Sequence, residues 1–320
     1  MSRRAVLAAG LLLLAGCASA PSALDPQSPQ ARDIGGLWWL MFVLAVVVWL
    51  VVTSLIVFAV VRRRRGDSSG RHDQPFILIG GSITVMILAV VAVYTVRTTT
   101  ALASRPAALT IHVAGEDWWW RVTYPSLGIS TANEIHVPID QTVNVTLTSD
   151  NVIHSFWVPQ LAGKVDVIPG QTNHLSFLPE RAGTYRGQCA EFCGIQHARM
   201  AFTVVVDTDA TFRQWTAAQQ ATPAAPTESL AQAGQAAFEN GPCAGCHTVA
   251  GTSATGTLGP NLTHVGSRAT LAADTLPNTP AGMTRWLEHT QQVKPGALMP
   301  QLDLSTDEVR ALVAYLEGLR

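Results

Sequence analysis

The chain has 320 residues, of which 48% are hydrophobic and only 13% are charged, and its formal net charge at pH 7 is −1. This length allows two or more domains, and the low charge content is typical of proteins with a membrane-embedded part. The near-zero net charge gives no indication of a nucleic-acid partner.

The N-terminus has the pattern of an export signal, because Arg3 and Arg4 precede a short apolar stretch and then small residues. Its end, Leu14-Ala15-Gly16-Cys17, resembles the lipobox of bacterial lipoproteins, in which the cysteine is lipidated. We therefore expect a lipoprotein-type signal peptide over residues 1–16 and an N-terminal exported segment over 17–36. An uncleaved signal, with Cys17 as an ordinary apolar residue, is the alternative.

Two charge-free apolar runs follow, over residues 37–61 and 75–96. Since roughly 20 helical residues cross a bilayer core about 30 Å thick, both runs are predicted to be transmembrane helices, with two buried core helices as the alternative. The loop between them, 62–74, contains five arginines, which marks the cytoplasmic side. The sequence thus predicts a two-pass protein of a bacterial plasma membrane, in contact with its lipid, with both termini on the outer, periplasmic side.

The exported part changes character along its length. Residues 107–207 contain about eight short segments rich in β-branched and aromatic residues, which is typical of a sandwich or barrel. Residues 208–229 end in a small, polar, proline-bearing stretch and are predicted to be a linker. Residues 230–320 show helical periodicity, and Ser305-Thr306-Asp307-Glu308 is a predicted capping box before the last helix.

The stretch CAEFCGIQHARM places Cys189, Cys193, His197 and Met200 within residues 189–200, which we call the copper loop. Thiolate, imidazole and thioether ligands together favour copper. Zinc is the first competitor, but it gains little from a thioether. A mononuclear blue-copper site uses one cysteine, so a second thiolate fits a bridged pair of copper ions. A disulfide between the two cysteines is the structural alternative.

The copper loop resembles the binuclear CuA loop of cytochrome c oxidase subunit II, and the resemblance covers roughly residues 30–207, including GEDWWW and HSFWVPQLAGKVD. It implies a multidomain membrane protein in which a two-helix transmembrane hairpin precedes a cupredoxin-like Greek-key β-barrel. The implied residue roles are bridging thiolates at Cys189 and Cys193, one copper-binding imidazole each at His154 and His197, a weak axial ligand at Met200 and the opposite carbonyl ligand at Glu191.

The same resemblance implies two further roles. The Glu191 side chain would face a magnesium ion shared with the catalytic subunit, whereas an ordinary solvated carboxylate is the alternative. Trp118 would be the aromatic residue at which electrons enter, whereas a packed surface tryptophan is the alternative. His112, His136 and His174 lie in strand contexts without ligand-type neighbours and are predicted to be structural or exposed.

Residues 243–247, CAGCH, form a c-type haem attachment motif, in which Cys243 and Cys246 meet the haem vinyl groups and His247 binds the iron. Such haems usually take methionine as second axial ligand. Met299 precedes the terminal helix, as in all-α class I cytochromes c, and is preferred to Met283, which is expected to pack. GPNL, 259–262, resembles that family's loop under the histidine, so the Pro260 carbonyl would orient the imidazole.

A subunit II joined to a cytochrome c resembles the caa-type haem-copper oxidases of bacteria. The resemblance implies an electron-entry subunit that receives electrons from cytochrome c or quinol–cytochrome c reductase and passes them through haem c and CuA to subunit I. Subunit I would reduce oxygen to water and pump protons, in a complex with other oxidase subunits. The small subunit of a CuA-containing nitric oxide reductase and a free-standing membrane-anchored electron carrier are the alternatives. Asp73 is the one candidate for an acidic residue that many subunit II chains place before the second span, and its role in proton uptake stays open.

Overall fold

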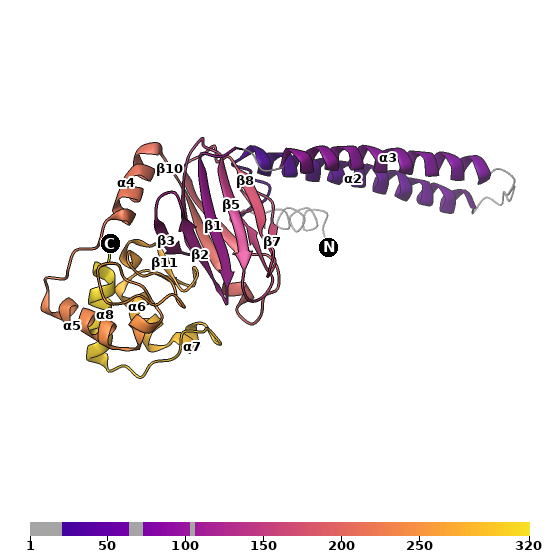
Figure 1. The fold of residues 1–320 in the computed structure, drawn as a ribbon. Helices are drawn as coiled ribbons and strands as arrows, with labels where there is room; N and C mark the ends of the chain where they lie inside the picture. Colours follow the sequence, from indigo (N-terminus) through magenta and orange to yellow (C-terminus); the bar gives the residue numbers. More distant parts are fainter. Residues whose placement is uncertain (1–20, 64–72, 103–105) are drawn as a thin grey trace, which may run out of the picture. The chain divides into compact units, whose positions relative to one another are not determined.

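The computed structural model describes residues 21–63, 73–102 and 106–320 (Figure 1). The predicted signal peptide, Cys17 and most of the predicted cytoplasmic loop lie outside these residues. The chain forms two compact units, which are described separately below. One unit is residues 30–103, and the other combines the chain before residue 30 with the chain after residue 103.

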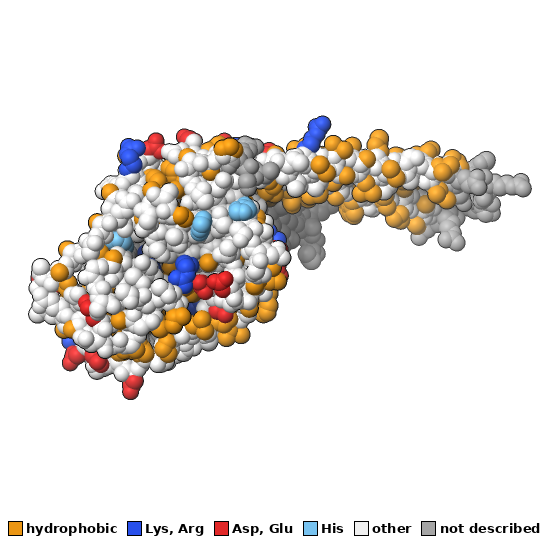
Figure 2. Space-filling model, in the orientation of Figure 1, with side chains coloured by type: hydrophobic (Ala, Val, Ile, Leu, Met, Phe, Trp, Pro, Cys, Tyr) orange, Lys and Arg blue, Asp and Glu red, His pale blue; other side chains and the backbone are white. Residues whose placement is uncertain are grey.

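The first unit consists of two long apolar helices, α2 (Pro29–Arg63) and α3 (Asp73–Ala101). Both begin before and end after the predicted spans 37–61 and 75–96, because helical hydrogen bonding continues into the polar residues that flank each apolar run. Their large apolar side chains are exposed along their length, and Figure 2 shows hydrophobic side chains over most of the visible surface of these helices. Both helices are long and apolar enough to cross a membrane.

The β domain of the second unit contains two five-stranded sheets (Figure 1). β1 pairs in parallel with β5, and β4 pairs in parallel with β10, while the other neighbours are antiparallel. The first sheet has the order β3 (Ile129–Ala132), β2 (Trp119–Tyr124), β1 (Leu109–Glu116), β5 (Val143–Ser149), β8 (Asn173–Phe177). The second has the order β4 (Glu134–Pro138), β10 (Ala201–Asp207), β9 (Gly183–Cys189), β6 (His154–Trp157), β7 (Val165–Val167).

The core of the β domain lies between these sheets. Along β5 the side chains alternate between buried and half-buried, which is the period-two pattern of a strand with one face on the core. Trp120, Phe156 and Phe202 are fully buried and form a cluster with ring centroids 4.5 to 5.7 Å apart. β3 and β7 are too short to give a periodic signal, so the structure has more strands than the eight or so predicted.

The predicted linker 208–229 differs from the structure in its first half. Helix α4 (Asp209–Gln220) begins at Thr208, whose hydroxyl accepts a hydrogen bond from Thr211 N at 3.3 Å. Phe212 and Trp215 lie three residues apart on this helix and pack against the core of the β domain. The packing of these two partly buried aromatic side chains stabilises the helix. Only the residues between α4 and α5 are irregular.

The α domain is a helical bundle with a small hairpin. The predicted capping box is confirmed, since Ser305 N donates to Glu308 Oε2 at 2.9 Å and the Ser305 hydroxyl accepts from Glu308 N at 3.3 Å. Helices α5 and α8 cross where Gly234 of α5 has no side chain, and Phe238 and Tyr315 pack beside the crossing. The elements are α5 (Ser229–Asn240), η2 (Pro242–Gly245), η3 (Val265–Ser267), β11 (Thr270–Leu271), β12 (Leu276–Pro277), α6 (Pro280–Glu288), α7 (Thr290–Val293) and α8 (Thr306–Gly318).

Candidate metal and haem sites

Strand register brings the first group of ligand-type residues together. Cys189 ends β9 and His154 begins β6, and these two strands are antiparallel neighbours, with Phe156 opposite Cys189. The copper loop then turns back towards β10 through the short helix η1 (His197–Arg199). A histidine 35 residues before the loop therefore lies beside its first cysteine.

The side chains of this group point at a common centre. The Cys189 and Cys193 sulfurs are 3.7 Å apart and both cysteines are free. His154 Nδ1 lies 3.9 Å from the Cys189 sulfur, and His197 Nδ1 lies 3.7 Å from the Cys193 sulfur. Ligands bound to one metal at about 2.0–2.3 Å are separated by roughly 3.3–3.8 Å in a tetrahedral site. The spacing of these donor atoms therefore suits the binding of soft metal ions. The structure has both cysteines free and thus does not contain the alternative disulfide.

Two weaker donors lie at opposite ends of the pair. The thioether of Met200 lies 3.8 Å from the Cys193 sulfur, and the carbonyl of Glu191 lies 3.2 Å from the Cys189 sulfur. Cys189, Cys193 and Met200 are at most 5% exposed. The sulfur donors are thus shielded from bulk water, whereas His197 is half-buried at the edge of the group.

His154 is held by residues that the sequence analysis did not identify. Its Nε2 lies 3.1 Å from the Asn151 side-chain oxygen, which leaves Nδ1 directed at Cys189. A Cβ atom added at Gly115 would lie 2.6 Å from the His154 ring, so the absence of a side chain there makes room for the imidazole. Asn151 belongs to no recognisable motif, and Gly115, although it begins the GEDWWW stretch, is revealed as a neighbour of His154 only by the packing of β1 against β6.

The two thiols influence each other strongly. The hydrogen bond between the two thiols, aided by His154 and backbone groups, lowers the pKa of Cys189 in spite of burial. The same contact raises the pKa of Cys193. The contact therefore favours the thiolate at Cys189, which is the form of cysteine that binds metals.

The three consecutive tryptophans have different surroundings. Trp118 Nε1 donates to the Cys193 carbonyl at 2.7 Å, and its ring would lie 2.9 Å from a Cβ atom added at Gly194. Trp120 is buried in the core, and the Trp119 ring lies under the Arg121 guanidinium at 4.8 Å. Trp118, which the family resemblance singled out, is therefore the one of the three whose indole donates a hydrogen bond to the copper loop.

The Glu191 side chain is directed away from the sulfur ligands. It is 45% exposed, and its carboxylate lies 3.8 Å from the Lys164 ammonium group, which is also exposed. An exposed ion pair of this kind contributes little to stability. The carboxylate is therefore free to meet a group outside the chain.

The haem motif lies in the α domain, where Cys243 belongs to η2 and Cys246 follows it. Both cysteines are free and half-buried. His247 Nδ1 donates to the Pro260 carbonyl at 2.8 Å, which leaves Nε2 for an iron atom. Burial lowers the pKa of His247, which favours the neutral imidazole that a metal requires. A Cβ atom at Gly259 would lie 2.5 Å from this ring.

The two candidate methionines differ in their surroundings. Met283 is 2% exposed and packs in the core of the α domain, whereas Met299 is partly buried in a loop. Gln291 holds this loop, because its Nε2 donates to the carbonyls of Ala297 and Met299, both at 2.8 Å, and its Oε1 accepts from Gly296 N at 2.9 Å. No motif in the sequence indicates this role for Gln291.

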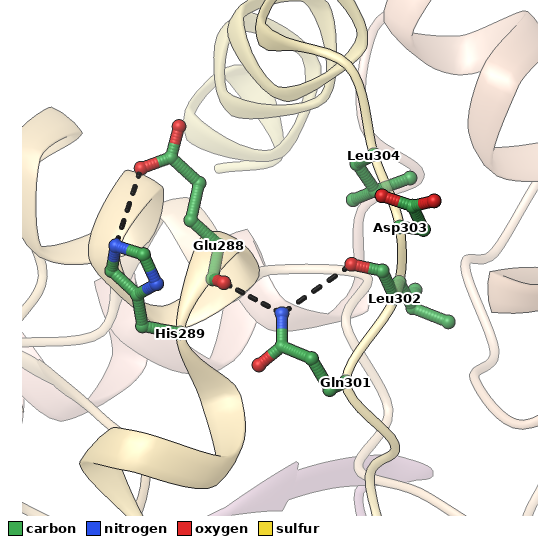
Figure 3. Close-up of a pocket in the computed structure, with 6 residues that line it drawn as sticks. All are labelled: Glu288, His289, Gln301, Leu302, Asp303 and Leu304. Carbon is green, nitrogen blue, oxygen red and sulfur yellow. Dashed lines mark hydrogen bonds and ion pairs between the residues drawn. The ribbon is translucent and has the colours of Figure 1, made fainter.

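The chain after Met299 borders a surface hollow (Figure 3). Gln301 Nε2 donates to the Glu288 carbonyl at 2.6 Å and to the Leu302 carbonyl at 3.3 Å, which ties this stretch to the end of α6. No cysteine, methionine or buried charge lines the hollow, which is formed by Glu288, His289, Gln301, Leu302, Asp303 and Leu304. We interpret the hollow as a gap in the surface packing beside the loop that contains Met299.

A second titratable cluster lies in the β domain away from the cysteines. His136 Nδ1 lies 2.7 Å from Asp207, its Nε2 lies 3.2 Å from Glu134, and Trp215 stacks on its ring at 4.4 Å. Burial alone lowers the pKa of His136, but the hydrogen bonds to both carboxylates outweigh it and the net pKa is raised. The pKa of Glu134 is lowered, since hydrogen bonds from His136 and from Ala269 N outweigh its burial.

Two family models match the chain. The model described as cytochrome c oxidase subunit II, periplasmic domain, matches residues 127–208, and the cytochrome c model matches residues 231–320. The chain is 34% identical over 246 residues to a cytochrome c oxidase subunit 2 of Alkalihalophilus pseudofirmus, covering 74% of this chain and 71% of the relative. It is 31% identical over 259 residues to that of Bacillus sp. (strain PS3), covering 74% and 72%.

Among solved structures, the periplasmic domain of subunit II of the Bradyrhizobium japonicum cytochrome oxidase is 30% identical. It covers 37% of this chain and 97% of that one, with a TM-score of 0.36. The family matches confirm the predicted fold class, in which two apolar N-terminal helices precede a cupredoxin-like β domain and a C-terminal helical cytochrome c domain.

Proposed function

Because this chain belongs to the cytochrome c oxidase subunit II family and carries a C-terminal cytochrome c domain, we propose that it is the electron-entry subunit of a caa-type haem-copper oxidase. The observation that carries this proposal is the convergence of two thiols, two imidazoles and a thioether at the copper loop. A relay needs a centre that accepts and releases single electrons, and the chain offers one such ligand set in each exported domain.

The ligand set supports a pair of copper ions rather than one zinc ion. Each sulfur has an imidazole of its own, since Cys189 faces His154 and Cys193 faces His197. The Glu191 carbonyl, next to the Cys189 sulfur, and Met200, next to the Cys193 sulfur, would each add a weak donor. A bridged copper pair would supply a one-electron couple, and the close spacing of the largely buried donor atoms would limit the change of geometry between its two redox states.

The residues of the cytochrome domain fit a covalent haem c. Cys243 and Cys246 would form the two thioether bonds, and His247, oriented by the Pro260 carbonyl, would bind the iron. Met299 would be the second axial ligand, and its loop is already fixed by Gln291. Methionine ligation raises the haem potential, which suits a carrier between an external donor and a respiratory oxidase.

The proposed electron path runs from an external cytochrome c or quinol–cytochrome c reductase to haem c, then to the copper pair, and then into subunit I. Reduction of oxygen to water and proton pumping belong to subunit I. Trp118 is the proposed entry aromatic, because its indole contacts the copper loop directly. The exposed Glu191 carboxylate is available for a magnesium ion shared with subunit I.

The proposed topology places both redox domains on the periplasmic side of a bacterial plasma membrane. Gln27 N donates to the Gln160 carbonyl at 2.7 Å, and Glu180 N donates to the Gln27 carbonyl at 3.0 Å, so the residues just before α2 are bound to the β domain. The excess of arginine in the loop between the two apolar runs supports a cytoplasmic position for that loop, and the redox domains would then lie on the opposite side of the membrane. Lipidation at Cys17 and proton uptake at Asp73 remain predictions.

The test is purification of the full chain with its partner subunits in mild detergent, followed by metal analysis and paramagnetic resonance. We expect two coppers and one covalent c haem per chain, a mixed-valence dicopper signal, co-purifying a-type haem, and oxygen consumption exceeding nitric oxide reduction. Cys193→Ser is expected to abolish the dicopper signal and keep the haem spectrum, and the control Met283→Leu is expected to keep both. Zinc, or a single copper, in the folded wild-type chain would overturn the proposal.

A further inference from the structure

The loop of the cytochrome domain that leads to Met299 lies against the copper loop. We call residues 293–299 the methionine loop. Both loops belong to one compact unit. Gln196 Nε2 donates to the Pro295 carbonyl at 2.7 Å, and a Cβ atom added at Gly296 would lie 2.4 Å from Ile195 Cδ1. The two segments that bear the proposed axial methionines of both centres are therefore in direct contact.

Lys294 is the central residue of this contact. It is 3% exposed, although lysine is among the residues least often buried. Its ammonium group donates to the carbonyls of Trp118 at 2.6 Å and Arg199 at 2.8 Å, both in the β domain, and to that of Ala272 at 3.3 Å in its own domain. An ammonium group has three donors, and all three are satisfied by carbonyl oxygens from the two domains together.

No carboxylate of the residues that the structure describes lies within ion-pair distance of Lys294. None of the ion pairs among the described residues includes Lys294. Burial lowers the pKa of Lys294 to about 7. A buried cation is tolerated only where hydrogen bonds replace its water, and here two of the three acceptors are supplied by the other domain. Any other docking of the cytochrome domain would leave this group buried without partners or return it to solvent.

A continuous chain of contacts links Lys294 to a proposed copper ligand. Trp118 receives the ammonium hydrogen bond at its carbonyl and donates its indole N–H to the carbonyl of Cys193 at 2.7 Å. Arg199, the other acceptor, lies between His197 and Met200 in the sequence. The position of Lys294 is thus coupled to the backbone of the copper loop on both sides.

We propose that Lys294 is a positioning residue that fixes the register of the methionine loop on the copper loop, so that an electron passes directly from the haem domain to the copper site of the same chain. This inference rests on the proposed function. With both groups bound, a reduced haem held by Cys243, Cys246 and His247 would supply one electron to the copper pair held by the copper loop, so that one centre would be oxidised and the other reduced by one electron. No bond is formed or broken and no proton is transferred.

The first test uses the wild-type chain and its two lysines, Lys164 and Lys294. Lys164 is 53% exposed at its side chain, so it serves as the internal reference. The detergent-solubilised holoprotein is treated with an amine-reactive acetylating reagent, and the modified peptides are followed by mass spectrometry. We expect Lys294 to react at least about tenfold more slowly than Lys164, because the contact must open before the reagent enters. Equal rates at the two lysines would overturn the proposal.

The second test measures intramolecular electron transfer in Lys294→Met. The haem is reduced by a flash-activated photoreductant in the full chain with both groups loaded, and copper reduction is followed optically. Loss of hydrogen bonds from a charged group is expected to lower the docked population, and with it the transfer rate, by about tenfold. The control Arg310→Met removes an exposed positive charge from α8 of the same domain and should leave the rate unchanged.

The optical and paramagnetic spectra of both centres are recorded for each variant. A slower transfer with unchanged spectra supports a positioning role, because a structural defect in either centre would alter its spectrum. An unchanged rate in Lys294→Met with both spectra intact refutes the role of Lys294 and leaves the proposed function standing. Absence of any haem-to-copper transfer in the wild-type chain would instead overturn the proposed function.

Discussion

Replacement of Gly234 by alanine tests the helix crossing that holds the cytochrome domain together. The new Cβ atom would lie 1.9 Å from the Ala311 carbonyl oxygen and 2.8 Å from Tyr315 Cβ. An ordinary contact begins at 3.4 Å, so the shortfall is 3.4 − 1.9 = 1.5 Å. The nearest atoms belong to the backbone of α8, and no side-chain rotation can relieve the overlap. The two helices must therefore move apart.

The expected cost combines three effects. Overpacking of a core costs about 1–3 kcal/mol, and loosening of the Phe238–Tyr315 ring pair costs about 0.5–1.5 kcal/mol more. Replacing a helical glycine by alanine returns about 1 kcal/mol. The net loss of about 2 kcal/mol corresponds to a decrease of roughly 10 °C in the melting temperature of a domain of this size.

The assay is thermal unfolding of the full chain in detergent, followed by circular dichroism of the covalent haem. Gly318→Ala is the matched control, because it lies at the end of α8 with nothing within 4 Å of the added Cβ atom. We expect this control to melt at or slightly above the wild-type temperature. If Gly234→Ala melts with the wild type while the control behaves as expected, the helices have room at their crossing and the packing argument fails.

Three further predictions concern single side chains. Because the pKa of His136 is raised above 6.5, its ion pairs stabilise the fold fully below pH 6.5 and progressively less as pH rises through the raised pKa. His136→Gln is thus expected to lower the free energy of unfolding by about 1–3 kcal/mol at pH 6 and by less at pH 9, measured by denaturant unfolding. A loss that does not change with pH would contradict this. Gly115→Ala is expected to displace the His154 ring and to weaken copper binding by about 10- to 100-fold in a chelator competition. The far-ultraviolet circular dichroism spectrum should be retained. An unchanged copper affinity would show that the ring can move without loss of binding. Gln291→Leu is expected to loosen Met299 and lower the haem potential, measured by redox titration, whereas an unchanged potential would show that the loop holds itself.

Much of the site could be predicted because its ligands are close in sequence. Cys189, Cys193, His197 and Met200 lie in one loop, and the spacing alone limits how far apart their donor atoms can be. The haem motif is more local still, since two thiols and an imidazole follow each other within five residues. The charge-free runs and the capping box are equally local signals, and the corresponding helices are present.

The residues that hold these ligands in place could not be predicted in this way. Asn151 acts on His154 from the turn before β6, Gly115 acts on it from β1, and Gln291 acts on Met299 because its side chain reaches across the loop. Asparagine, glycine and glutamine occur in many structural contexts, so the residue type alone does not predict that it positions a ligand.

The sequence by itself determined which chemistry the chain can support, because ligand type and short spacing are set by covalent geometry. Only the tertiary structure decided which tryptophan touches the copper loop, that the first half of the expected linker folds as α4, and that Lys294 lies buried between two domains. Each of these outcomes depends on contacts between residues far apart in the chain. Such contacts follow from strand register and side-chain packing, which no local pattern of residues specifies.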